Sequence, residues 1–185
     1  MLASAISIAA VSALLPAAFA SPTLAARACD GGAHVQGKPT SIEGINWPWG
    51  GPGEWRVNTA LAGSQLYSEF GMRSSAGEWF VEPSTQDPSK YIIRSTAVND
   101  LVISVSGTGG APQLSTFDAA DATQRFEINC DLCSRPGTAQ PHAFTCSFKT
   151  SSNECITSLL PGSAMGTRPC TSDWWWDQQF DFLIQ

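Results

Sequence analysis

An internal repeat is the feature of this 185-residue chain that most constrains its fold. Three segments, spaced roughly 50 residues apart, end in the same kind of phrase, in which Glu or Gln lies close before an aromatic residue. The phrases are centred on Phe80, Phe126 and Phe180, and the last two share the form Gln-x-Phe. A repeat of this length predicts three copies of one structural unit, so we expect the three phenylalanines to lie in a common core.

Each repeat contains short strand-like runs. Leu101 to Val105 and Phe144 to Phe148 are rich in β-branched and aromatic residues, and turn clusters such as Ser106 to Gly110 separate the runs. About four short strands per repeat cannot bury their own apolar face, but three such units around an axis can close a barrel capped with hairpins. The predicted class is all-β, in one domain (29–185) with pseudo-symmetric four-strand repeats at about 29–83, 88–129 and 140–185.

Charge excludes two classes of partner. Only 14% of the residues are charged and the net charge is −6, with no basic run anywhere in the chain. An acidic surface repels nucleic acid phosphates and anionic lipid headgroups. We therefore expect neither nucleic acid nor a membrane surface to be the partner.

The first 20 residues have the pattern of a signal peptide. Ala5 to Leu15 is an apolar run, Pro16 interrupts it, and Ala18-Phe19-Ala20 is a small-x-small cleavage signal. The run is too short to span a bilayer. We expect cleavage before Ser21, a disordered leader over 21–28 and an extracellular, secreted protein. An alanine-rich leader and few lysines are typical of fungal secreted proteins.

Six cysteines follow the leader, and an even number in an exported chain predicts three disulfides. The C-x-x-C pair of Cys130 and Cys133 has no second such pair and no histidine at ligand spacing, so we expect structural bridges rather than a metal or redox site. The cysteines are Cys29, Cys130, Cys133, Cys146, Cys155 and Cys170.

Catalysis has little support in the sequence. His34 and His142 lie in polar, turn-rich segments with no recognisable nucleophile or base beside them. A carboxylate pair such as Asp173 and Asp177 is most simply solvated. We expect a protein that is not an enzyme and that uses no cofactor and no metal.

The third repeat carries the clearest resemblance to a known family. It has Cys155-Ile156-Thr157, then Cys170, then Gln178-x-Phe180. This pattern resembles the ricin B-type lectin family, whose repeats end in Gln-x-Trp, with Phe here in place of Trp. The resemblance covers about residues 52–185 and implies a β-trefoil fold and carbohydrate binding.

The family resemblance also bears on the disulfides. In the family, a cysteine pair at these positions bridges two strands within one repeat, which implies a Cys155–Cys170 bond. The other four cysteines allow three pairings. Among these we choose Cys130–Cys146 with Cys29–Cys133.

The sugar site of the family needs an acidic residue on the second strand of a repeat, an aromatic platform and an amide just before the Gln-x-Trp. Apolar sugar faces stack on aromatic rings, while carboxylate and amide groups hold the hydroxyls. The three acid positions here hold Arg56, Ser104 and Thr157, so the usual acid is absent and the predicted site is degenerate.

Two repeats keep part of the sugar-binding set. Repeat one keeps Gln65 and the platform residue Tyr67, while repeat three keeps Asp177 and Gln178 without a platform. The run Trp174-Trp175-Trp176 precedes the third Gln-x-Phe, and at least one of its rings should be exposed because neighbours on a strand alternate in direction. These seven residues are the predicted carbohydrate-binding residues.

The predicted function is that of a secreted carbohydrate-binding protein, with a carbohydrate or glycoprotein as its partner. A second hypothesis is a protein-binding trefoil, such as a protease inhibitor or a secreted effector with a target protein. It depends on the long segment Ser134 to Pro141, which is braced by prolines and holds Arg135. A third hypothesis is a structural or signalling protein with no small ligand.

Overall fold

The computed structural model describes residues 29–44, 53–70, 79–133, 142–158, 162–171 and 176–184. Several predictions lie outside these residues: the signal peptide, the leader, the segment 134–141, and Trp174 and Trp175. The side chain of Trp176 is also outside the description, although its backbone begins a short 3-10 helix. The described residues form no helix long and apolar enough to cross a bilayer.

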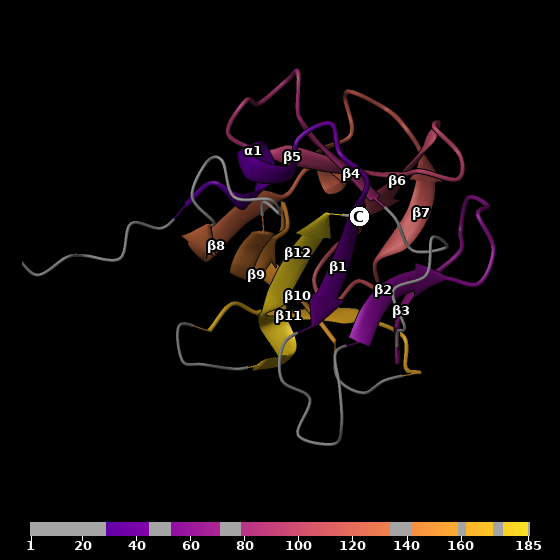
Figure 1. Ribbon diagram of the computed structural model, residues 1–185. Helices are drawn as coiled ribbons and strands as arrows, with labels where there is room; N and C mark the ends of the chain where they lie inside the picture. The colour runs from indigo at the N-terminus through magenta and orange to yellow at the C-terminus, as the bar shows by residue number, and fades with distance from the viewer. Residues whose placement is uncertain are drawn as a thin grey trace, which may run out of the picture.

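Twelve strands and a few short helical turns make up the described chain (Figure 1). Six strands form the wall of a barrel: β1 (Thr40–Gly44), β4 (Trp79–Pro83), β5 (Tyr91–Ser95), β8 (Glu127–Cys133), β9 (His142–Lys149) and β12 (Phe180–Ile184). Six form three hairpins: β2 (Gly53–Val57) with β3 (Leu66–Phe70), β6 (Leu101–Ser104) with β7 (Gln113–Thr116), and β10 (Glu154–Thr157) with β11 (Gly166–Pro169). The helical turns are α1 (Gly31–Val35), η2 (Ala122–Gln124) and η3 (Trp176–Gln178).

The barrel closes on itself. Antiparallel pairing runs from β12 through β1, β4 and β5, and β8 pairs with β9, which returns to β12. The remaining junction, between β5 and the start of β8, is a bridge in which Tyr91 and Phe126 exchange backbone hydrogen bonds of 2.8 and 2.9 Å. Closure leaves no unpaired edge along the wall.

The three hairpins bond to one another across the pseudo-symmetry axis. The first and second hairpins are joined where Leu66 N donates to Pro112 O and Leu114 N donates to Ser64 O, both at 2.8 Å. The third joins the first where Met165 N donates to Leu66 O at 2.9 Å. A six-stranded barrel capped by a triplet of hairpins is the β-trefoil arrangement, so the predicted fold class is confirmed.

Aromatic side chains fill much of the space between barrel and cap. The ring of Trp55 lies 4.7 Å from that of Phe148 and 5.0 Å from that of Phe180, measured between centroids. Phe148 in turn meets Phe182 edge-on at 5.4 Å. Offset and edge-to-face contacts of this kind add to the stabilisation from burial. One cluster therefore links the first hairpin to the strands of the third repeat.

The structure corrects the alignment of the first repeat by one residue. The residue equivalent to Phe126 and Phe180, both fully buried, is Trp79, which is 1% exposed, whereas Phe80 is only half-buried. Val81, two residues after Trp79, is buried as well. Neighbours on a strand point to opposite faces, so only one of the adjacent aromatics can face the core. The expectation that Phe80 is a core anchor is wrong.

Three disulfides link Cys29 to Cys133, Cys130 to Cys146 and Cys155 to Cys170. This is the set of pairs chosen from the sequence. The first ties the start of the described chain to β8, and the second joins β8 to β9, the first strand of the third repeat. Only Cys155–Cys170 lies within one repeat, where it links β10 to the residue after β11. No described cysteine is free.

The short helix α1 lies against the barrel at the end away from the hairpin β10–β11 (Figure 1). A Cβ on Gly31 would lie 2.1 Å from Cys130 Sγ, and one on Gly32 would lie 2.5 Å from the ring of Tyr91, so both positions need glycine for close approach. Asp30 caps the helix and accepts a 2.5 Å hydrogen bond from the Tyr91 hydroxyl. Burial, together with this bond, raises the pKa of Tyr91.

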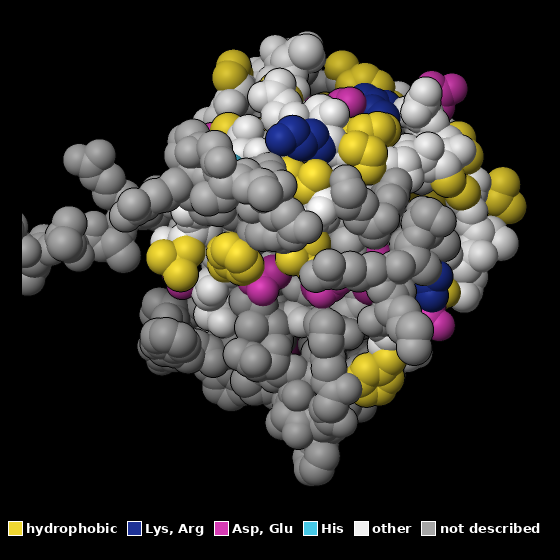
Figure 2. All heavy atoms as spheres, in the orientation of Figure 1, with side chains coloured by type: hydrophobic (Ala, Val, Ile, Leu, Met, Phe, Trp, Pro, Cys, Tyr) yellow, Lys and Arg dark blue, Asp and Glu magenta, His cyan; other side chains and the backbone are white. Residues whose placement is uncertain are grey.

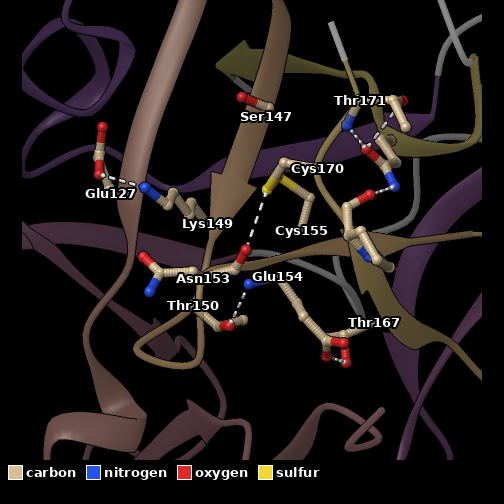
Figure 3. Close-up of a disulfide and its surroundings, with 12 residues drawn as sticks. Glu127, Ser147, Lys149, Thr150, Asn153, Glu154, Cys155, Thr167, Cys170 and Thr171 are labelled. Carbon is tan, nitrogen blue, oxygen red and sulfur yellow. Dashed lines mark hydrogen bonds and ion pairs between the residues drawn. A yellow bond between two sulfur atoms is a disulfide. The ribbon is translucent and has the colours of Figure 1, made fainter. Parts of the chain in front are cut away.

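Glu154 connects the second and third hairpins, and Figure 3 shows its contact with Thr167 in the third. Its Oε2 accepts hydrogen bonds from Thr167 Oγ1 and from the backbone N–H of Gly109, both at 2.6 Å. Hydrogen bonds to the ionised form hold the pKa of Glu154 below its ordinary value, with the Thr167 bond contributing most. The charge of one carboxylate therefore contributes to the assembly of the cap.

A pH-dependent effect of Glu154→Gln on stability follows. The carboxylate stabilises the fold above its unfolded pKa, about 4.3, and this contribution is lost as the pH falls through the lower folded value. We expect the thermal midpoint of the wild type to exceed that of the variant at pH 7, with the gap closing on acidification towards pH 3. Asp131→Asn, at an exposed position on β8, is the control. A difference in thermal midpoint between wild type and Glu154→Gln that stays the same from pH 7 to pH 3 would contradict the stabilising role of the Glu154 carboxylate.

Candidate functional site

The glutamine of the Gln-x-Phe phrase holds the backbone of its own repeat. Gln124 donates through Nε2 to Thr116 O at 2.9 Å and accepts at Oε1 from Asp118 N at 2.9 Å. Gln178 repeats this pattern, donating to Pro169 O at 3.1 Å and accepting from Thr171 N at 3.2 Å (Figure 3). Both amides thus join the end of a hairpin to the strand that follows it.

The positions of the missing acid are occupied by side chains with local partners. Arg56 on β2 forms an ion pair with Glu69 on β3. The hydroxyls of Ser104 and Thr157 are buried, and Thr157 Oγ1 donates to Cys155 O at 3.3 Å. These positions therefore offer a ligand no carboxylate.

Gln65 and Tyr67 line one pocket of about 450 Å³, which we call the Tyr67 pocket. Both side chains point from the same face of the first hairpin, because residues two apart on a strand share a face. Tyr67 is half-buried, and its hydroxyl donates to Asn58 Oδ1 at 2.6 Å, which fixes the ring. Gln65 is exposed. The described residues that line it are Asn58, Thr59, Ser64, Gln65, Leu66, Tyr67, Gly162 and Ala164.

Part of the Tyr67 pocket could not be located from the sequence. Gly162 and Ala164 come from the third repeat and reach the first hairpin through the cap, where Tyr67 and Ala164 form a bridge. Asn58 follows β2 and meets Tyr67 only because the two strands pair, Arg56 lying opposite Tyr67. Asn58 is an unforeseen candidate, and its only signal was its place in a polar turn after a strand.

Asp177 and Gln178 lie together in a smaller pocket of about 220 Å³ with Arg168, Pro169 and Thr171. Asp177 is 6% exposed, and its Oδ1 has no hydrogen-bond partner in the part of the chain that the structure describes. Burial raises the pKa of Asp177, and Arg168, whose Nη1 lies 3.8 Å from Oδ2, partly opposes that shift. The structure therefore keeps Asp177 and Gln178 apart from Gln65 and Tyr67, in a different repeat.

A row of carboxylates crosses the outer face of the sheet. In register, Asp181 on β12 lies opposite Glu43, Glu43 lies opposite Glu54, and Glu54 lies opposite Glu69. Figure 2 shows acidic side chains in a band across this face. Like charges in opposite positions repel, and the repulsion is offset where Ser41 Oγ donates to Glu54 at 2.7 Å and where Thr145 N donates to Asp181 at 3.0 Å. The described residues contain no group of His, Cys, Asp and Glu side chains placed to hold a metal ion.

The fold is shared with solved structures of low sequence identity. The designed threefold-symmetric protein ThreeFoil is 9% identical, with 80% of this chain and 98% of that one covered and a TM-score of 0.56. The BEL β-trefoil is 11% identical over 81% and 94%, with a TM-score of 0.59. A Polyporus squamosus lectin, solved with a human-type influenza-binding epitope, is 13% identical over 80% and 49%, with a TM-score of 0.54.

Those likenesses establish the β-trefoil fold and nothing finer, because the identities are far below the level at which function carries over. The neighbours include a lectin and a cytolethal distending toxin, so the resemblance noted in the sequence is supported at the level of the fold. No family model matches the sequence, and no curated protein matches it. Three disulfides are typical of extracellular proteins.

Proposed function

We propose that this protein is a secreted carbohydrate-binding protein that uses the Tyr67 pocket, and that it binds its ligand without catalysing a reaction. The observation that carries the proposal is a half-exposed aromatic ring, fixed by a hydrogen bond to Asn58, beside the exposed amide of Gln65. A fixed ring costs little entropy to stack on, and this favours contact with the apolar face of a sugar.

The polar lining suits hydroxyl groups. Gln65 and Asn58 supply amide donors and acceptors, and the hydroxyls of Thr59 and Ser64, 3.0 Å apart, supply more. None of the side chains in the described part of the lining is a carboxylate or a cation, so this part of the pocket favours a neutral ligand over an ion. Without a charged group to orient the hydroxyls, we expect weak binding, on the order of millimolar per site, or about 4 kcal/mol.

The third repeat is the weaker candidate for the sugar site, because two of its predicted binding residues already have partners within the protein. The side-chain amide of Gln178 donates to Pro169 O and accepts from Thr171 N, so it has little hydrogen-bonding capacity left for a ligand. Asp177 is buried and faces Arg168. A contribution from the tryptophans 174–176 remains part of the proposal from sequence, and Trp175→Ala tests it.

Tyr67→Ala is the test of the proposed site. The mature chain is screened on a glycan array, and the best glycan is then titrated by calorimetry against wild type, Tyr67→Ala, Tyr67→Phe and Trp175→Ala. We expect Tyr67→Ala to weaken binding at least tenfold, because it removes the stacking surface. Tyr67→Phe keeps the ring but loses the bond to Asn58, so its loss should be smaller.

Phe70→Ala is the matched control, since Phe70 is an exposed aromatic at the end of the same strand and outside the pocket. Binding that survives Tyr67→Ala with an unchanged circular dichroism spectrum would show that the site is elsewhere. If no glycan binds on the array and no sugar shifts the amide signals of the mature chain at 100 mM, carbohydrate recognition is ruled out in favour of the protein-binding hypothesis. A protease panel is then the next measurement.

A further inference from the structure

Phe80 lies on the outer wall of the barrel, where an aromatic ring has no role in the core. It faces Arg94 across the β4–β5 pair, and both side chains are half-buried. Together with four neighbours they line a second pocket of about 450 Å³. We call it the barrel-wall pocket, and its lining is Gly37, Phe80, Glu82, Arg94, Asn99 and Asp100.

The guanidinium of Arg94 is held rigidly in this pocket. Its Nε donates to Glu82 Oε2 at 3.0 Å, and its Nη1 donates to the carbonyl of Asn99 at 2.5 Å. The same group stacks over the ring of Phe117, 4.8 Å from the centroid. Three contacts on one planar group fix its orientation, and Nη2 makes no hydrogen bond with any described residue.

The turn between β5 and β6 places two further polar side chains at the pocket. The backbone of this turn is fixed, because Asn99 O accepts from Arg94 and Asp100 O accepts from Phe117 N at 2.8 Å. The side chains of Asn99 and Asp100 are exposed and form no hydrogen bond or ion pair with any described residue. An amide and a carboxylate are therefore available to a ligand at a fixed place.

We propose that the barrel-wall pocket is a second carbohydrate-binding site, which makes each chain divalent. Phe80 offers a stacking surface, Asp100 accepts hydrogen bonds from hydroxyls, and Asn99 and Arg94 donate to them. Glu82 and Asp100 outweigh the one cation, so the pocket disfavours an anion. The inference rests on the proposed function for the class of ligand only, since the residues are different.

The two sites lie on different parts of the fold. The Tyr67 pocket is made by the hairpin cap, whereas the barrel-wall pocket is made by β4, β5 and the turn after β5. One bound sugar therefore does not block the other. Two sites on one chain raise the apparent affinity for a surface dense in glycan, typically by a hundredfold or more, without any new contact.

The experiment follows backbone amide signals by NMR on the ¹⁵N-labelled mature chain. The probes are galactose, N-acetylgalactosamine, glucose, mannose, N-acetylglucosamine and fucose, each titrated to 100 mM. We expect one or more of them to shift the amides of Gly37, Asn99 and Asp100 with a saturable curve. Phe80→Ala and Asp100→Asn should abolish these shifts and leave those of Gln65 and Tyr67 unchanged.

Tyr67→Ala should abolish the shifts in the Tyr67 pocket and leave those of Gly37, Asn99 and Asp100 unchanged, which separates the two hypotheses. Shifts confined to the Tyr67 pocket would overturn the second site and leave the proposed function standing. Shifts confined to the barrel-wall pocket would overturn the Tyr67 site and leave this inference standing. No saturable shift with any of the six sugars overturns the second site. Asp131→Asn and Phe70→Ala are the matched controls, at exposed positions outside both pockets.

Discussion

Replacing Cys29 and Cys133 together by serine is expected to lower the free energy of unfolding by about 4–5 kcal/mol. Among the described pairs, this disulfide closes the longest loop, with a sequence separation of 104 residues. Because a bond that closes a longer loop removes more entropy from the unfolded chain, its loss should lower the free energy of unfolding by more. The variant should still fold, because neither residue is a central part of the aromatic core. Guanidinium unfolding, followed by circular dichroism and tryptophan fluorescence, measures the difference.

The double variant of Cys155 and Cys170 is the matched comparison. Its bond closes a loop of 15 residues, for which the same reasoning gives about 3 kcal/mol. The expected result is therefore an order of effects, with the long-range bond costing more than the local one. The reverse order, with equal slopes of the unfolding curves, would show that strain or solvation in the unfolded chain outweighs loop closure.

Trp79→Ala is expected to lower the free energy of unfolding by about 3–5 kcal/mol, because it deletes a fully buried aromatic side chain. Phe80→Ala, one residue away, should cost about 1 kcal/mol or less, because its ring is half-exposed on the barrel wall. The pair tests the one-residue correction in the first repeat directly. The same guanidinium titration measures both variants.

Phe80→Ala also serves the sugar experiment, since a stable variant is needed there. If Phe80→Ala unfolds the protein and Trp79→Ala does not, the inward-facing residue of β4 is Phe80 and the barrel-wall pocket does not exist. If both variants lowered the free energy of unfolding by the same large amount, β4 would be buried on both faces. Either outcome contradicts the structure described here.

The fold could be predicted from the sequence because the repeat is long and the Gln-x-Phe phrases recur at Phe126 and Phe180. The register of the first repeat could not, because Trp79 and Phe80 are adjacent and both apolar. Only strand pairing decides between them, since a slip of one residue exchanges the two faces of a strand. The segment before Gly53 fitted the repeat poorly in sequence, and the structure finds α1 and β1 there.

The candidate site could be predicted only where its residues lie on one strand. Gln65 and Tyr67 were predicted together from the resemblance of the first repeat to the ricin B-type pattern, and they share one pocket because residues two apart on a strand share a face. Asn58 and Ala164 were not, because hairpin pairing and the cap bring them to Tyr67 from separate parts of the chain. Gln178 stays a predicted ligand-binding residue, and the sequence could not indicate that its amide also bonds to Pro169 O and Thr171 N.

The pairing of β1 with β12 has a consequence for the order of folding. Residues 40–44 meet residues 180–184, so the barrel closes only after contacts that span most of the chain have formed. Such long-range pairing is slow. The bonds Cys130–Cys146 and Cys155–Cys170, with separations of 16 and 15 residues, can form while the chain is still open, whereas Cys29–Cys133 must wait for distant segments to meet. We therefore expect the two short-range bonds to form before Cys29–Cys133.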